Sequence, residues 1–142
     1  SGLPVGFGEP WFEGIEPALA RALMAIPAAR AVEFGRGVNA GLMRGSKHND
    51  KWGEDMSLDE GADGALGGMA SGAPIHVRVT FKPPSGISKP QETFNQVTGM
   101  MEELAIKGRH DPVIAPRARP VVEAVARLVI ADLGIQGGYI DG

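Results

Sequence analysis

Apolar residues at helical spacing predict a first helix near the start of the chain. Leu19, Leu23 and Ile26 recur at i, i+4 and i+7, which places them on one helical face. Pro17 is well tolerated in the first helical turn, where its missing N–H leaves no hydrogen bond unmade. Pro27 is expected to end this helix, because proline cannot continue the backbone hydrogen bonds.

A second helix is predicted toward the C-terminus. Pro120 marks its first turn, Gly134 is expected to cap its end, and residues 135–142 are expected to form a tail without a regular pattern. Few charges interrupt its apolar stripe, so this helix is expected to be well buried. The stripe consists of Val121, Val125, Leu128, Val129 and Leu133.

Alternating apolar and polar residues predict strands between the two helices. The clearest runs over 75–82, and shorter strands are expected at 30–34 and 38–43. Such alternation is typical of a sheet with one buried face, which favours antiparallel pairing. In the longest strand the residues expected to face the core are Ile75, Val77, Val79 and Phe81.

The segments outside these elements are expected to be irregular. Residues 1–10 and 83–98 are punctuated by proline and glycine, and residues 44–61 alternate charges of both signs, which indicates a solvated excursion from the core. Residues 1–142 are therefore predicted to form a single α+β domain, an antiparallel sheet packed on helices.

The composition supports a folded domain and excludes several classes of protein. Hydrophobic residues make up 43% of the 142 residues, enough for a core. The 14 Lys and Arg are outnumbered by 17 Asp and Glu, so the net charge of −3 argues against a nucleic-acid partner. No apolar run approaches the roughly 20 residues of a membrane helix. The missing initiator Met and signal peptide lead us to expect a processed product or a piece of a longer chain.

No metal site is expected. The chain has no cysteine, which also removes disulfides and thiolate nucleophiles and fits a reducing compartment. Its histidines are His48, His76 and His110, and no two of them stand four residues apart. His48 is expected to be solvated, and His76 to lie on the polar face of its strand.

Three segments could carry chemistry, and each also has a purely structural interpretation. The glycine-rich residues 61–72 lack the Lys-Ser/Thr of a phosphate loop and could serve only turns. Lys82 to Ser85 could hold a phosphate, or could form only an ordinary turn at the end of the preceding strand with a solvated lysine. Arg109 could bind a carboxylate or phosphate and Asp111 could assist proton transfer, or both could lie in a solvated turn.

Six segments, taken in order, resemble chorismate synthase. The resemblance runs from Ser1 to about Leu133 and corresponds to the C-terminal half of the longer family chain. The segments are SGLPVGFGEP (1–10), LMAIPAARAVEFG (23–35), RGSKHND (44–50), GALGGMASG (64–72), FKPPSGISKP (81–90) and GRHDPVIAPRARPVVEA (108–124).

The resemblance implies both a fold and a reaction. The family fold is a β-α-β sandwich of two similar halves, usually assembled as a homotetramer and expected in the cytoplasm. The reaction is the anti 1,4-elimination of phosphate from 5-enolpyruvylshikimate 3-phosphate, which gives chorismate for aromatic amino acid biosynthesis. It needs reduced FMN without net redox change, and no nucleic acid or membrane takes part.

Carried over residue by residue, the resemblance also implies site residues. Lys82 would be a cation near the flavin or its phosphate, and Gly67 would let the backbone approach the cofactor closely. Asp111 matches the acid that the family places near flavin N5, and Arg109 could also contact the anionic substrate. The implied FMN contacts are Pro27, Ala28, Gly67, Lys82, Pro83, Pro84, Ser85, Gly86 and Arg109.

Departures from the family pattern leave two alternatives open. Glu60, Gly61 and Asp63 stand where Asn or His and two glycines are usual, and Pro84 and Gly86 remove hydroxyl groups. A non-catalytic assembly module that keeps the fold is therefore one alternative, and a generic phosphate-binding α+β domain is another. The family's two catalytic histidines lie in the half that is not matched, so this chain is expected not to turn over alone.

Overall fold

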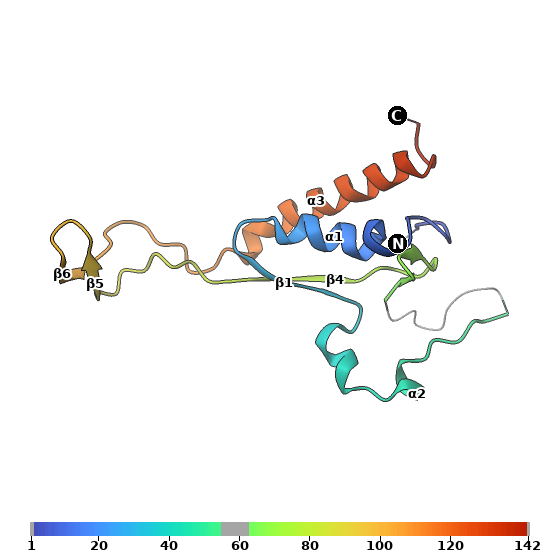
Figure 1. The fold of residues 1–142 in the computed structure, drawn as a ribbon, viewed down its shortest axis with the longest axis horizontal. Helices are drawn as coiled ribbons and strands as arrows, with labels where there is room; N and C mark the ends of the chain where they lie inside the picture. The colour runs from blue at the N-terminus through green and yellow to red at the C-terminus, as the bar shows by residue number, and fades with distance from the viewer. Residues whose placement is uncertain (1, 55–62, 142) are drawn as a thin grey trace.

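The computed structural model describes residues 2–54 and 63–141 (Figure 1). The end of the polar stretch predicted at 44–61, including Glu60 and Gly61, lies outside the described residues. No helix in the described part of the chain is long and apolar enough to cross a membrane.

Short helices and strands follow one another along the described chain, and one long helix ends it. In chain order they are the 3-10 helix η1 (Trp11–Glu13), α1 (Ile15–Met24), β1 (Ala29–Phe34), the 3-10 helix η2 (Gly37–Leu42), α2 (Gly45–His48), β2 (Ala65–Leu66), β3 (Met69–Ala70), β4 (Val77–Phe81), β5 (Gln91–Asn95), β6 (Met100–Leu104) and α3 (Ala115–Gln136).

The central ribbon pairs β1 with β4 in antiparallel register. Val32 lies opposite Val79 and Glu33 opposite Arg78, so apolar and charged pairs alternate along the ribbon. Val32 and Val79 pack against the core, whereas the Glu33 carboxylate and the Arg78 guanidinium form an ion pair at 3.2 Å with Arg78 63% exposed. This arrangement confirms the strands predicted at 30–34 and 75–82, the second shortened to Val77–Phe81, and their antiparallel pairing. Of the four side chains expected to face the core, Val77 does not pack on it and is 36% exposed.

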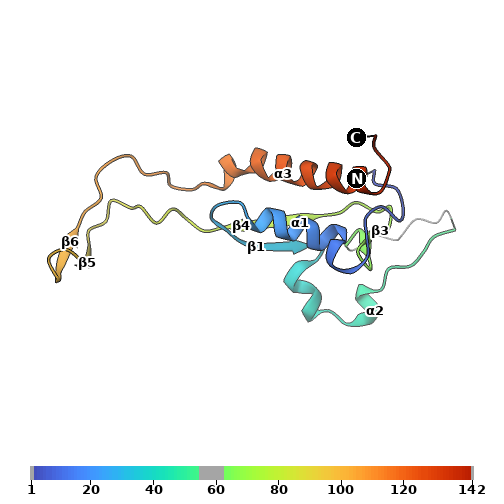
Figure 2. The ribbon, with the colours of Figure 1, turned by 45° about the horizontal axis from the view of Figure 1, so that its top comes forward.

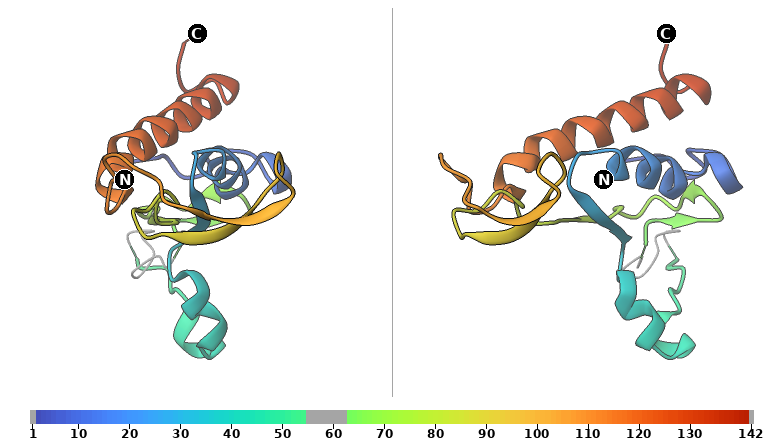
Figure 3. Two further views of the ribbon diagram at one scale, coloured as in Figure 1. Left: turned by 90° about the vertical axis from the view of Figure 1, so that its left-hand side faces the viewer. Right: turned by 60° about the vertical axis from the view of Figure 1, so that its left-hand side comes forward.

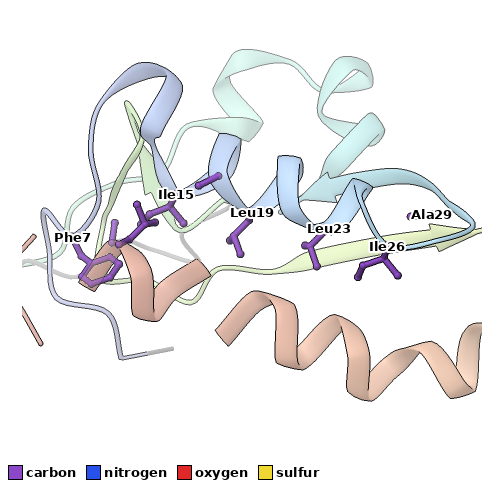
Figure 4. Close-up of a cluster of buried hydrophobic side chains, with 9 residues drawn as sticks. Phe7, Ile15, Leu19, Leu23, Ile26 and Ala29 are labelled. Atoms are coloured by element: carbon purple, nitrogen blue, oxygen red, sulfur yellow. The ribbon is translucent and has the colours of Figure 1, made fainter. Parts of the chain in front are cut away.

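The core forms where α1 packs between the ribbon and α3. Ile15 and Leu23 are fully buried and Leu19 is 3% exposed. These side chains project from one face of α1 (Figure 4), which confirms the helical face predicted from their spacing. Helices α1 and α3 lie on the same side of the ribbon, and η2 and α2 lie on the other (Figure 3). The fold is α+β, as predicted.

The strand predicted at 38–43 is wrong, because this segment is the 3-10 helix η2. Gly35 and Gly37 adopt positive φ angles of 52° and 56° and turn the chain out of β1. The Glu33 side chain then accepts the N–H of Val38 at 3.2 Å. This hydrogen bond is the main cause that lowers the pKa of the Glu33 carboxyl, and the hydrogen bond from Arg78 is the second. Val38 is 76% exposed, so the apolar positions here do not mark a buried face.

The loop predicted at 83–98 contains strand β5, which pairs with β6 in a hairpin. Its turn is stabilised locally: Asn95 Oδ1 accepts the N–H of Val97 at 2.9 Å, and Gly99 has a φ of 70°. Glu102 accepts hydrogen bonds from Thr98 and then Asn95, which lower its pKa. The hairpin projects far from the core on two extended segments (Figures 1 and 2).

Helix α3 is longer than predicted at both ends. It begins at Ala115 with Pro116 in its first turn, so Pro120 lies inside the helix and not at its start. Gly134 lies inside it too, and Gly137 follows its last residue with its N–H on Leu133 O at 2.9 Å. Two residues expected in the tail at 135–142 therefore belong to α3.

The expectation that α3 is well buried is also wrong. Of its residues, Leu133 and Gly134 are buried, whereas Val121 is 47% and Leu128 70% exposed. The side chains that pack on the core are Val122, Val125, Ala126, Val129, Ile130 and Leu133. The helix packs against α1 and β4 on one side only, so two of the five residues in the predicted stripe, Val121 and Leu128, face outward.

We expect Leu23→Ala to lower the free energy of unfolding of this chain by about 2–5 kcal/mol, because it opens a cavity in the core. Leu128→Ala is the matched control and should change it by less than about 0.5 kcal/mol, since that side chain is 70% exposed. Urea denaturation followed by circular dichroism measures both. Equal losses would contradict the proposed core.

Candidate functional site

The turn between α1 and β1 lies beside the end of β4. Ala28 holds a left-handed φ of 70°, which is unusual for a residue with a side chain. Its carbonyl accepts the backbone N–H of Lys82 at 3.0 Å. Pro27 and Ala28 therefore adjoin Lys82, although 54 positions separate Ala28 from Lys82 in the sequence.

The turn that follows Lys82 lies next to the GRHDP segment. A Cβ placed on Gly86 would stand 3.9 Å from His110 Nδ1. His110 Nε2 lies 3.2 Å from the carbonyl oxygen of Ile106, within hydrogen-bond distance. Two of the predicted contact segments, 82–86 and 108–112, thus approach one another at Gly86 and His110.

Asp111 stands between two arginines. Arg117 Nη1 donates a hydrogen bond to Asp111 Oδ2 at 2.5 Å, and Arg109 Nη2 lies 3.6 Å from Oδ1. The side chain of Asp111 is 38% exposed, whereas that of Arg109 is 88% exposed. The carboxylate is therefore held in place but open to solvent, and the Arg109 guanidinium, although paired with Asp111, is exposed enough to bind a further anion.

An open groove brings Pro27 and Asp111 together. Both line it, and so does Arg117. Its remaining lining is apolar and comes from the end of α1 and the start of α3: Ile26, Ile114, Ala118 and Val121. The groove therefore combines an apolar wall with one ion pair, Asp111 with Arg117.

Gly67 lies outside this groove. It belongs to the turn between β2 and β3, where the neighbouring Gly68 accepts the N–H of Ile15 at 2.8 Å. That contact is at the start of α1, whereas Pro27 follows its end, and a helix of 10 residues spans about 15 Å. Gly67 has a φ of 62° and open space within 4 Å of where a Cβ would stand.

A second groove is lined by residues that had no predicted role. It is lined by His48, Trp52 and Asp63 among others, and His48 Nε2 lies 3.7 Å from Asp63 Oδ2. His48 is half-buried with 31% of its side chain exposed, so it is less solvated than expected. Burial, followed by the charge of Asp63, raises the pKa of Glu16. In the described residues, no group of three His, Asp or Glu could hold a metal ion.

Arg117, which lines the groove with Pro27 and Asp111, had no predicted role. This residue falls within the GRHDPVIAPRARPVVEA segment, six positions after Asp111. Arg117 lies in the first turn of α3, shortly after Asp111, and this position could have indicated its role. It was missed because the helix was predicted to begin near Pro120, whereas α3 begins at Ala115.

The groove joins an apolar wall to Asp111 and Arg117, and the chain belongs to the chorismate synthase family. The family model described as chorismate synthase matches residues 1–135. Chorismate synthase from Dehalococcoides mccartyi is 46% identical over an alignment of 142 positions that covers 97% of this chain and 39% of that protein. The enzyme from Aeropyrum pernix is 48% identical over an alignment of 135 positions that covers 92% of this chain and 36% of that protein.

A crystal structure of chorismate synthase has a similar fold. Its TM-score is 0.69 at 29% sequence identity, and the match covers 95% of this chain and 34% of that one. The family resemblance seen in the sequence is thus confirmed. The chain spans about two fifths of the length of the curated relatives it matches.

We expect Ala28→Gly to raise the free energy of unfolding by about 0.5–1 kcal/mol, because a left-handed φ costs a residue with a Cβ about 1–2 kcal/mol. Ala25→Gly is the matched control, since Ala25 has a right-handed φ of −73°, and it should lower stability by about 0.5–1 kcal/mol. Urea denaturation compares them. A loss of stability in both variants would show that the turn is not strained.

Proposed function

We propose that this chain is part of a chorismate synthase and carries much of its FMN site. The reaction would be the anti 1,4-elimination of phosphate from 5-enolpyruvylshikimate 3-phosphate. The observation that supports it is the groove shared by Pro27 and Asp111, two residues from distant family segments. Membership of the family supplies the reaction class.

The residues present fit FMN. Ile26, Pro27 and Ile114 offer an apolar wall to a flavin ring, and the exposed cations Lys82 and Arg109 could pair with its phosphate. The turn Pro83, Pro84, Ser85 and Gly86 would add backbone contacts, because it follows Lys82 directly. Gly67 remains in the proposal as a contact outside the groove. When bound, reduced FMN would supply electron density to the substrate.

Asp111 would move a proton in this site. A 1,4-elimination removes a proton and a leaving group from the two ends of an H–C–C=C–C–O unit. The C–H electrons form a new double bond, the existing one shifts to give a conjugated diene, and the phosphate leaves with the C–O bonding electrons. Asp111 Oδ1 lies 3.6 Å from Arg109, beyond the usual range of a hydrogen bond, and so keeps a lone pair for the proton. Arg109, 88% exposed, would bind the anionic substrate.

The rest of the proposal concerns the complete enzyme. The part of the family chain that this chain does not match would supply the two catalytic histidines and most substrate-binding arginines. The assembly would be a homotetramer in the cytoplasm, with the small-molecule substrate as its ligand. Since the chain spans about two fifths of its relatives, these parts need a test beyond this chain.

The isolated chain is expected to form no chorismate from 5-enolpyruvylshikimate 3-phosphate and reduced FMN under anaerobic conditions. The physical reason is that the histidines which protonate the flavin and face the leaving phosphate lie outside the matched part. Absorbance of chorismate measures this, with the complete enzyme as positive control. Steady chorismate formation by the 142-residue chain would contradict the expectation.

In the complete enzyme, we expect Asp111→Ala to lower turnover about 100-fold or more, in the range of general acid–base catalysis. FMN affinity, measured by fluorescence quenching, should change less than about threefold, because the apolar wall is untouched. Asp132→Ala is the control, since Asp132 accepts a hydrogen bond from Gln136 far along α3. Unchanged turnover in Asp111→Ala would contradict the proposed role of Asp111 in proton transfer. If the unaltered protein did not quench FMN fluorescence, the non-catalytic assembly module would be favoured instead.

A further inference from the structure

Arg117 is the stronger of the two cationic partners of Asp111. It is the third residue of α3, and its backbone N–H donates to Ile114 O at 3.0 Å. Its side chain reaches back to Asp111 Oδ2 at 2.5 Å. Arg109, by contrast, follows Gly108 in an irregular segment, and its nearest approach to the carboxylate is 3.6 Å.

We propose that Arg117 is a positioning residue that fixes the Asp111 carboxylate in the groove. The inference rests on the proposed role of Asp111 in proton movement. Arg117 occupies Oδ2, which leaves Oδ1 as the oxygen that exchanges the proton. Because Arg117 stands on the first turn of a long helix, the carboxylate takes its orientation from α3 and not from the segment that carries it.

An anchor of this kind is needed because Asp111 lies outside any regular element. The residues between β6 and α3 form no helix or strand, so the backbone alone leaves the side-chain torsions of Asp111 free. A shift of about 1 Å in a catalytic group can cost about 100-fold in rate. A fixed hydrogen bond to a helix removes that freedom.

The same contact contributes little to stability. Arg117 is 69% exposed, and exposed ion pairs are typically worth less than about 1 kcal/mol. A positioning role and a structural role therefore predict different results: the first changes turnover without changing unfolding, and the second changes both. The chain contains a matched ion pair to separate them, Arg21 with Glu13 at 3.3 Å, in which Arg21 is also 69% exposed.

The experiment compares Arg117→Ala, Arg117→Lys and Arg21→Ala in the complete enzyme. Arg117→Ala should lower kcat about 10- to 100-fold, with KM for the substrate and FMN affinity within about twofold. Arg117→Lys should recover part of the loss, since an ammonium keeps one hydrogen bond. Arg21→Ala should leave kcat within about twofold. The thermal unfolding midpoints of all three should stay within a few degrees of the parent.

Combination with Asp111→Ala decides whether Arg117 acts through Asp111. Once Asp111 is removed, Arg117→Ala should cost nothing further. An equal loss in both backgrounds, an unchanged kcat in Arg117→Ala, or a change in KM or FMN affinity alone would each overturn the inference and leave the role of Asp111 standing. Unchanged turnover in Asp111→Ala by itself would instead overturn the proposed function and the inference with it.

Discussion

The burial of one face of α1 is the interaction on which the other elements depend. Ile15 and Leu23 are fully buried and Leu19 nearly so, and each such side chain contributes about 1.5–3 kcal/mol. A two-stranded ribbon such as β1–β4 is marginal by itself, and α3 contacts the core along one side only. Both are held because α1 packs against them, so the groove at the end of α1 depends on the same contacts.

Burial also explains which elements the sequence predicted. Helix α1 and strands β1 and β4 each bury one face, so their apolar spacing carries the signal. The β5–β6 hairpin buries neither face: Phe94 is 57% and Met101 61% exposed, and its strands show no alternation to detect. At residues 38–43 the error was the opposite one, since a strand was predicted where none exists. Alternation alone does not distinguish a buried strand from a 3-10 helix with exposed apolar residues such as Val38.

The candidate site was predicted residue by residue but not as an arrangement. The family resemblance named Pro27, Lys82 and Asp111, yet nothing in their spacing along the chain indicates that Pro27 and Asp111 share a groove. The contact between Ala28 and Lys82 follows from the register of β1 against β4, which long-range pairing decides. Arg117 was missed for a related reason, since its role depends on where α3 begins.

The groove is formed where the ends of two helices meet. Ile26 and Pro27 follow the end of α1, and Ile114 precedes the start of α3. Because α1 and α3 pack on one core, these groups keep their separation without help from a ligand. Segments 82–86 and 105–111 instead leave the core toward the hairpin (Figure 2). A site of this kind needs its reactive group tied to the rigid part, since ordering it on binding would cost affinity and rate. The hydrogen bond from Arg117 to Asp111 makes that tie.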